Sequence, residues 1–289
     1  MSILFLHIPK AAGTYVDSCV KQSKINSVHA VSSTEALKKA LGAKKNYIAG
    51  HFTFHNLQAA QTPYDEYKLV TVIRNPIDRF ISDVNYHVEI IKRGEKFLQN
   101  HSTGWQGLIK NTYESLAEAQ ESGIADFSHL SKVMLREYLA SRLLTNQEHR
   151  HLRTVSVKEA AEVLERAISR FSFFGIVENG GADSLLNYVS SDLNLDISAC
   201  KPNANASTNY VPYDAILPTL TAAFEKSEVS NMLHLMLTQE LPTDTNSMDW
   251  QDVNQMAIKS YISGSRYRKK EICTLPQFDP KIFESNISN

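Results

Sequence analysis

The stretch Ile3-Leu-Phe-Leu-His-Ile-Pro-Lys-Ala-Ala-Gly-Thr-Tyr15 decides the fold. Its first part, Ile3 to Ile8, is a short and nearly continuous apolar run, which is typical of a strand buried on both faces of a parallel sheet. Pro9 and a few small residues interrupt the pattern, and apolar residues then follow at helical spacing as far as residue 22. A strand, a tight turn and a helix in this order predict an α/β fold.

Strands and helices continue to alternate along the rest of the chain. Further strands are expected over 46–52, 68–74 and 173–177. Further helices are expected over 77–91, 130–144, 157–170, 182–193 and 212–237. The third of these helices opens with Ser156-Val-Lys-Glu159, the pattern of a capping box. Segment 97–128 is polar and indicates loops with one helix over 113–120.

This alternation predicts a P-loop-like three-layer α/β fold, in which helices flank a central parallel sheet and further helices are added towards the C-terminus. Because no break in composition divides the chain, we expect a single domain over 1–289. Its core would span about 1–240, and 241–289 would form a polar extension with a loose tail.

Composition excludes several classes of function. The 289 residues carry 30 basic and 31 acidic side chains, so no bulk positive field marks a nucleic-acid partner. No apolar run approaches the roughly 18 residues of a membrane span, and the N-terminus lacks the pattern of a signal peptide. We therefore expect a cytoplasmic protein if the source is a prokaryote. Cys19, Cys200 and Cys273 are odd in number and widely spaced, which favours reduced core thiols over a disulfide framework.

The turn between the first strand and the first helix predicts an anion site. A helix N-terminus directs backbone N–H groups and a positive dipole end towards one point. The small residues Ala11, Ala12 and Gly13 allow a phosphate to reach this backbone, Thr14 adds a hydroxyl, and Lys10 adds a cation. A purely structural turn has the same pattern, so this stretch alone leaves both interpretations open. It is not a Walker loop, because its lysine precedes the small residues.

The segment H-I-P-K-A-A-G-T resembles the 5′-phosphosulfate loop of sulfotransferases that use 3′-phosphoadenosine-5′-phosphosulfate (PAPS). The similarity is greatest to the branch that includes the heparan sulfate O-sulfotransferases, whose members commonly read P-K-T-G-G-T-S. This chain departs from that pattern at Ala11, Ala12 and Tyr15. Small-molecule sulfotransferases often carry a tryptophan near adenine at the matching position, so the resemblance implies that Tyr15 contacts the nucleotide.

A second motif, Val72-Ile-Arg-Asn-Pro-Ile-Asp-Arg-Phe-Ile-Ser82, resembles the family's 3′-phosphate motif R-[DN]-P-x-x-R-x-x-S. Arg74 ends a strand, at the sheet edge where open α/β folds bind their ligands, and Ser82 lies about two turns into the next helix. The alternative interpretation is that the two arginines of the motif form surface ion pairs with Asp78 and Asp83. For this reason Arg79 is left outside the predicted site. Weaker resemblance continues at Phe173–Glu178 and Ser184–Leu186, and a poor match to a nucleotide-closing loop falls at 201–205.

Sulfuryl transfer needs charge stabilisation on the leaving phosphate and a base for the acceptor proton. Lys10 is the candidate for the first role. His51, in a Gly-His setting that resembles that of the heparan sulfate enzymes, is the candidate for the second, with His55 as its competitor. The two histidines could also form an H-x3-H metal pair, but no third ligand is evident, and we expect no metal. We expect the basic run at 266–270 to be a solvated tail.

The sequence therefore predicts an enzyme that transfers a sulfuryl group from PAPS to an acceptor hydroxyl and releases 3′-phosphoadenosine-5′-phosphate (PAP). The resemblance favours a carbohydrate acceptor, with residues 95–130 lining its pocket. No nucleic-acid partner and no membrane span are expected. Two alternatives stay open: a P-loop nucleotide kinase-like phosphotransferase, and a catalytically silent sulfotransferase-like protein that binds glycans.

Overall fold

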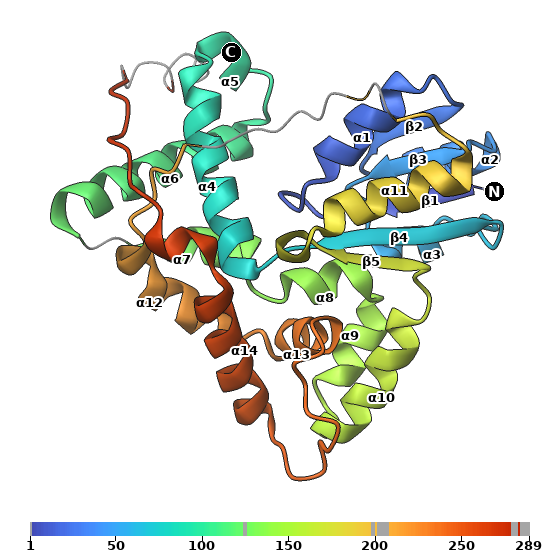
Figure 1. The fold of residues 1–289 in the computed structure, drawn as a ribbon. Helices are drawn as coiled ribbons and strands as arrows, with labels where there is room; N and C mark the ends of the chain where they lie inside the picture. Colours follow the sequence, from blue (N-terminus) through green and yellow to red (C-terminus); the bar gives the residue numbers. More distant parts are fainter. Residues whose placement is uncertain (1, 124–125, 198–199, 201–207, 279–282, 284–289) are drawn as a thin grey trace. The chain divides into compact units, whose positions relative to one another are not determined.

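The computed structural model describes the chain except residues 1, 124–125, 198–199, 201–207, 279–282 and 284–289 (Figure 1). The chain divides into two compact units. The first unit comprises residues 1–75, 137–205 and 227–259, and the second comprises 76–136, 206–226 and 260–289. The single domain expected over 1–289 stays a prediction. The weak match to a closing loop at 201–205 lies outside the described residues.

The first unit contains the parallel sheet that the sequence predicts. Its order is β2-β3-β1-β4-β5, and every neighbouring pair is parallel. The strands are β1 (Ser2–Leu6), β2 (Ser27–Val31), β3 (Tyr47–Gly50), β4 (Tyr67–Ile73) and β5 (Phe173–Ile176). The central strand β1 pairs Ile3 with Tyr47 on one side and with Lys68 on the other. The turn that follows β1 is therefore held at the carboxyl ends of the strands, where open α/β sheets bind ligands.

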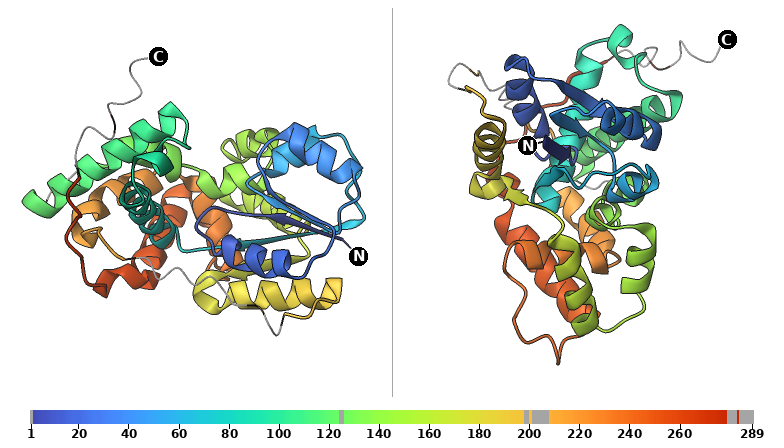
Figure 2. Two further views of the ribbon diagram at one scale, coloured as in Figure 1. Left: turned by 90° about the horizontal axis from the view of Figure 1, so that it is seen from above. Right: turned by 90° about the vertical axis from the view of Figure 1, so that its right-hand side faces the viewer.

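Helices cover both faces of this sheet, which confirms the predicted three-layer α/β architecture. Helices α1 (Gly13–Gln22) and α11 (Gly181–Leu193) lie on one side, whereas α2 (Thr34–Gly42) and α3 (Phe54–Ala59) lie on the other (Figure 2). Ile3 and Phe5 of β1 join the core cluster under α1 and α11, together with Val16, Val189 and their neighbours. The intervening residues of β1 are equally buried, which explains why the strand reads as a continuous apolar run.

Four more helices, with part of a fifth, complete the first unit: α8 (Tyr138–Leu143), α9 (Asn146–Leu152), α10 (Val157–Ile168), α13 (Glu228–Leu237) and residues 250–259 of α14 (Trp250–Gly264). The Ser156 side chain accepts a hydrogen bond from the Glu159 N–H, which is one of the two bonds of the predicted capping box. The prediction of one helix over 130–144 is wrong, because α7 (Ser128–Met134) ends before Glu137, whose left-handed conformation (φ 51°) precedes α8. The Glu137 carboxylate instead accepts N–H groups of Val229 and Ser230 in the first turn of α13.

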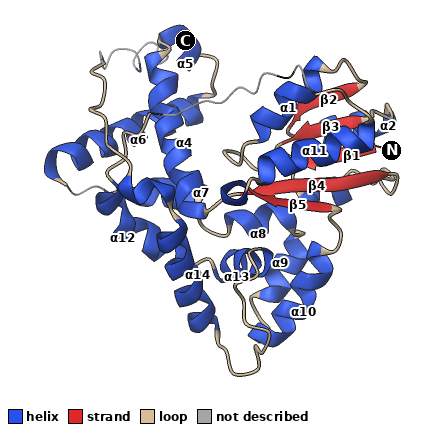
Figure 3. Cartoon of the chain, in the orientation of Figure 1, coloured by secondary structure: helices blue, strands red, loops and turns tan. Residues whose placement is uncertain are grey.

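The second unit is helical in its described residues (Figure 3). It contains α4 (Pro76–Lys92), α5 (Glu95–Leu98), α6 (Thr103–Ser122), α7 (Ser128–Met134), α12 (Tyr213–Phe224) and the short 3₁₀ helix η2 (Arg266–Lys269). The expectation of a loop-rich segment 97–128 is wrong, because α6 fills most of it. The interval 212–237 is helical, as expected, and comprises α12 and α13. Within the predicted polar extension, the described residues include the helix α14 and the 3₁₀ helix η2.

The basic run at 266–270 is not simply a solvated tail. The buried Asp78 carboxylate accepts from the Ser265 hydroxyl (2.6 Å) and lies 3.2 Å from Nε of Arg266. Tyr267 is itself buried. Arg79 is also buried, not a surface residue, and donates to the main-chain carbonyl of Met134. The charged residues next to the second motif therefore stabilise the second unit, and Arg79 stays outside the candidate site.

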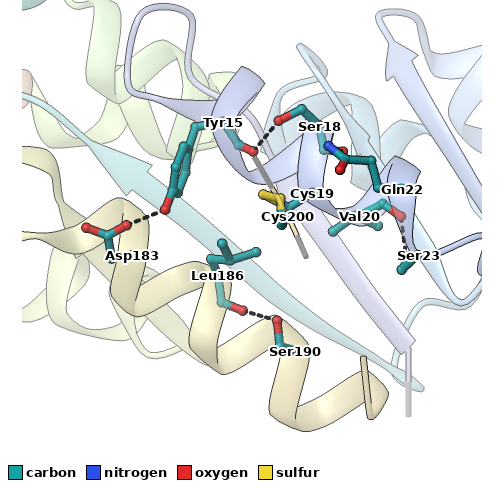
Figure 4. Close-up of a disulfide and its surroundings, with 10 residues drawn as sticks. All are labelled: Tyr15, Ser18, Cys19, Val20, Gln22, Ser23, Asp183, Leu186, Ser190 and Cys200. Carbon is teal, nitrogen blue, oxygen red and sulfur yellow. Dashed lines mark hydrogen bonds between the residues drawn. A yellow bond between two sulfur atoms is a disulfide. The ribbon is translucent and has the colours of Figure 1, made fainter. Parts of the chain in front are cut away.

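The expectation that all three cysteines are reduced is also wrong. Cys19 of α1 and Cys200, which follows α11, form a disulfide with a Cα–Cα distance of 5.4 Å (Figure 4). They are 181 positions apart in sequence. Spacing could not reveal this pair, because it is created when α11 packs beside α1 on the same face of the sheet. Cys273 is a free thiol and is exposed.

Candidate active site

The turn from Ile8 to Ala12 joins the central strand to α1 with unusual backbone geometry. Lys10 (φ 63°) and Ala12 (φ 59°) both lie in the left-handed region, which residues with a Cβ adopt rarely. Ala12 occupies the N-cap position of α1 and offers no side-chain hydrogen bond, and the first turn carries no acidic residue. The Tyr15 N–H donates to the Ala12 carbonyl at 3.0 Å, whereas the N–H groups of Gly13 and Thr14 have neither a backbone partner nor a side-chain cap among the described residues. This end of the helix is suited to an anion.

Gly13 is required for a reason that the sequence did not indicate. A Cβ at this position would lie 2.0 Å from Cδ2 and Nε2 of the His7 ring. The glycine therefore allows the loop to pack directly on His7, in addition to any access that it gives a phosphate. Thr14, the next residue, is exposed and can present its hydroxyl at the surface of the loop.

Tyr15 is tied to α11. Its hydroxyl donates to Oδ1 of Asp183 at 2.5 Å, from the first turn of α1 to the first turn of α11 (Figure 4). The hydrogen bond to this carboxylate is the main cause that raises the pKa of Tyr15 to about 12. The ring that departs most from the family loop is thus held in a fixed orientation beside it. Asp183 is a residue that sequence reasoning missed, and no local signal distinguished it.

Arg74 lies directly against the loop. It follows β4, is 7% exposed, and donates from Nη1 to the main-chain carbonyl of Lys10 at 3.0 Å. Its Nε lies 3.8 Å from Oε1 of Glu178, whose other oxygen accepts the Asn75 N–H at 3.1 Å. Nε and Nη2 of Arg74 are buried and make no hydrogen bond within the described part of the chain. Unpaired buried donors of this kind are costly unless a ligand satisfies them.

Glu178 is the residue that orients this arginine. It belongs to the 3₁₀ turn η1 (Val177–Asn179), which directly follows β5, the neighbour of β4 in the sheet. The sequence singled out the segment Phe173–Glu178 as a weak resemblance to the family, but it did not indicate that Glu178 contacts Arg74. Ser82 belongs to the second unit, on α4, where it is half-buried. Its placement beside Arg74 therefore stays a prediction.

His51 follows β3 and lies beside the same turn. Its Nδ1 is 3.0 Å from the main-chain carbonyl of His7, and its own carbonyl accepts from Nη1 of Arg142 at 2.8 Å. Because a carbonyl oxygen can only accept, Nδ1 must carry the proton, and the lone pair of the neutral ring is then on Nε2. Desolvation lowers the pKa of His51; the charges of Arg142 and Lys10 lower it further, and the bond to His7 acts against them.

The competing histidine has a different setting. His55 lies in the first turn of α3, is exposed, and makes no hydrogen bond or ion pair among the residues described. Within the same residues, no group of three His, Cys, Asp or Glu side chains is arranged to hold a metal ion. None of the described helices combines the length and the apolar character that crossing a bilayer requires.

Lys10, the small-residue loop, Tyr15, Arg74 and His51 thus meet at the carboxyl edge of one parallel sheet. Over residues 1–207, the chain matches the family model described as the sulfotransferase family. Since this match covers most of the 289 residues, the chain belongs to the sulfotransferase family. No curated protein and no solved structure matches the chain. The family assignment makes it a transferase of sulfuryl groups, and the specific heparan sulfate-like branch stays a prediction.

Proposed function

We propose that this protein transfers a sulfuryl group from PAPS to an acceptor hydroxyl, with the donor bound at the turn after β1 and at Arg74. One observation carries the proposal: the buried Arg74 guanidinium hydrogen-bonds the Lys10 carbonyl, and its Nε and Nη2 are buried and make no hydrogen bond in the described structure. One cationic site therefore lies beside an uncapped helix N-terminus. A nucleotide with phosphates on both its 3′ and 5′ sides satisfies both features.

In the proposed reaction, Lys10 and His51 carry the chemistry. The acceptor oxygen attacks sulfur, and the bond between sulfur and the bridging oxygen of the 5′-phosphate breaks in line with the attack. Lys10 stabilises the negative charge that accumulates on this leaving oxygen. Nε2 of His51 takes the proton of the acceptor hydroxyl, because Nδ1 is already committed to the His7 carbonyl. The products are the sulfate ester, PAP and a proton on His51.

The donor assignment is tested by calorimetry of the full chain with PAP and with ATP. We expect PAP to bind and ATP to bind far more weakly; the reverse order would favour a kinase-like phosphotransferase. Arg74→Ala should weaken PAP binding by about 10-fold to 100-fold, since a good Arg–phosphate contact contributes roughly 1–3 kcal/mol. Unchanged binding would remove Arg74 from the donor site.

The role of Lys10 is tested with a matched lysine on the same turn-and-helix segment. Lys10→Ala should nearly abolish transfer from labelled PAPS, whereas Lys21→Ala, at the exposed far end of α1, should leave it unchanged. Thermal denaturation of both variants serves as the control for folding. Equal turnover of the two variants would exclude Lys10 from the chemical step, and a catalytically silent protein would show no transfer even as wild type.

For the base, the matched pair is His51→Ala and His55→Ala. We expect only the first to remove the acidic limb of the pH–rate profile. Loss of this limb in His55→Ala instead would assign the base to α3. The comparison can be made with any acceptor that gives measurable turnover.

The acceptor is proposed to be a carbohydrate hydroxyl, on the resemblance of the loop motif alone. A screen of saccharides, phenols and peptides with labelled PAPS tests this choice. Residues 95–130 stay the predicted lining, although the helices α5 and α6 occupy much of the described part of this segment.

A cytoplasmic location likewise stays a proposal. The Cys19–Cys200 disulfide is of a kind that persists mainly in oxidising compartments, so cell fractionation with thiol labelling is the appropriate test.

A further inference from the structure

His7 connects the donor turn to His51 through its backbone. It directly follows β1, and its N–H donates to the Gly50 carbonyl at 2.8 Å, which continues the pairing of β1 with β3 by one step. The His7 carbonyl in turn accepts a hydrogen bond from Nδ1 of His51, the residue that follows Gly50. The same sheet register that places the donor turn therefore also fixes which ring nitrogen of His51 carries the proton.

The His7 side chain fills the space between these two parts. Its ring centroid is 4.5 Å from that of His51 and 5.5 Å from that of Phe5, on which it stacks. Its Cδ2–Nε2 edge lies so close to Gly13 that no Cβ could be placed there. The ring is thus held by the core, by the first residue of α1 and by His51. It cannot move without displacing one of them.

The charge of His7 is settled by its surroundings. The titratable groups that face it are His51, Asp17 and Lys10. Burial is the largest effect, and together with His51 and Lys10 it outweighs Asp17 and lowers the pKa of His7 to about 3. The ring is neutral near pH 7, so it adds no positive charge beside His51. A buried neutral ring of this kind acts by packing.

We propose that His7 is a positioning residue: its carbonyl fixes the Nδ1–H tautomer of His51, and its ring sets the separation between His51 and the donor turn. This inference rests on the proposed role of His51 as the base. It predicts that His7 affects the rate of transfer while leaving donor binding almost unchanged.

The tautomer can be measured without any acceptor. Two-bond ¹H–¹⁵N correlation spectra of the ¹⁵N-histidine-labelled wild type at pH 7.5, assigned with His51→Ala, should show His51 with its proton on Nδ1. A His51 proton on Nε2 would overturn the proposal. This result is independent of the proposed function, because it holds whether or not sulfuryl transfer is ever detected.

The ring is tested with two substitutions and a matched control. His7→Ala should lower turnover at saturating PAPS by about 10-fold to 100-fold, as expected for a catalytic group misplaced by about 1 Å, with PAP affinity within about 3-fold of wild type. His7→Leu, which is non-basic but similar in size, should recover part of this loss. His234→Ala removes an equally buried imidazole from α13 in the same unit and should reduce stability without this loss of turnover.

Two kinetic results would contradict the proposal. If His7→Ala and His7→Leu are equally slow and added imidazole restores both, His7 carries protons itself. If His7→Ala keeps wild-type turnover, the ring does not position His51. Should wild type show PAP binding but no transfer with any acceptor, the proposed function fails while the tautomer measurement still decides the role of the carbonyl.

Discussion

The contact between Gly13 and His7 predicts an unusual effect of a small substitution, Gly13→Ala. Gly13 is the first residue of α1 and has ordinary helical geometry, so propensity alone would favour alanine by about 0.5–1 kcal/mol. The added Cβ would, however, lie 2.0 Å from the His7 ring, whereas ordinary contacts begin at 3.4 Å. The added Cβ would therefore lie 1.4 Å closer to the His7 ring than an ordinary contact allows. Either His7 or the start of α1 must move.

The magnitude depends on how well His7 can yield. The ring stacks on Phe5, which is fully buried, and it also lies 4.5 Å, centroid to centroid, from the ring of His51, so its freedom to move is limited. Overpacking of such a site typically costs about 1–3 kcal/mol. Gly104, in the first turn of α6, provides the control, because a Cβ there would meet nothing within 4 Å. The difference in unfolding free energy between Gly13→Ala and Gly104→Ala should therefore be about 1–3 kcal/mol.

Urea denaturation of the two variants and the wild type measures this difference, and turnover with labelled PAPS measures its consequence. We expect Gly104→Ala to match or exceed the wild type in stability. Gly13→Ala should be less stable and should also lose about 10-fold or more in turnover, because the displaced ring carries His51 with it. Equal stability of the two alanine variants would refute the contact between Gly13 and His7, and with it the proposed spacing.

Three further perturbations test other parts of the first unit. Arg74→Lys should raise the Kd for PAP about 10-fold to 100-fold and also slow turnover at saturating PAPS, because a single ammonium cannot hold the Lys10 carbonyl and a phosphate together. Calorimetry measures the first effect and initial rates measure the second. If neither changes, the proposed dual role of Arg74 is wrong. Reduction of Cys19–Cys200, or the Cys19→Ser variant, should lower stability by up to about 5 kcal/mol from loop closure over 181 positions; a thermal midpoint insensitive to dithiothreitol would count against the bond. Because the pKa of His51 is lowered, the base is uncharged down to below pH 6.5, and turnover should fall only in more acidic solution. Arg142→Gln removes a cation that lowers this pKa, so the acidic limb of the pH–rate profile should move towards higher pH. A shift of the limb to lower pH would contradict this role of Arg142.

The strands and the turn that carry the candidate site could be predicted from the sequence, because each is marked by a local pattern. The runs in β1 and β4 are buried on both faces, so nearly every residue is apolar and the pattern shows little ambiguity. The turn after β1 is marked by Pro9, Lys10 and small residues. The edge strand β2 was missed because most of its residues are only partly buried and present no continuous apolar run.

The errors come from contacts between residues that are distant along the chain. The disulfide depends on α11 lying beside α1, and the basic run is ordered because Asp78 accepts from Ser265 and pairs with Arg266. Each partner alone is an ordinary polar or cysteine residue, and its type carries no information about the other. The same holds within the site, where Arg142 and Asp183 contact His51 and Tyr15 although neither residue belongs to a motif that the sequence singled out.

These distant contacts change how the loop itself should be understood. Taken alone, Lys10 and Gly13 suggest a flexible anion cradle, since a lysine is mobile and a glycine is permissive. In the structure, the Lys10 carbonyl is held by the buried Arg74, and Gly13 is packed against a buried ring. The backbone around Lys10 is therefore fixed before any donor arrives, which reduces the entropy lost when a phosphate binds. Groups that must stabilise a transient charge are most effective when they are preorganised in this way, and Arg74, which holds the Lys10 carbonyl, directly follows strand β4 of the parallel sheet.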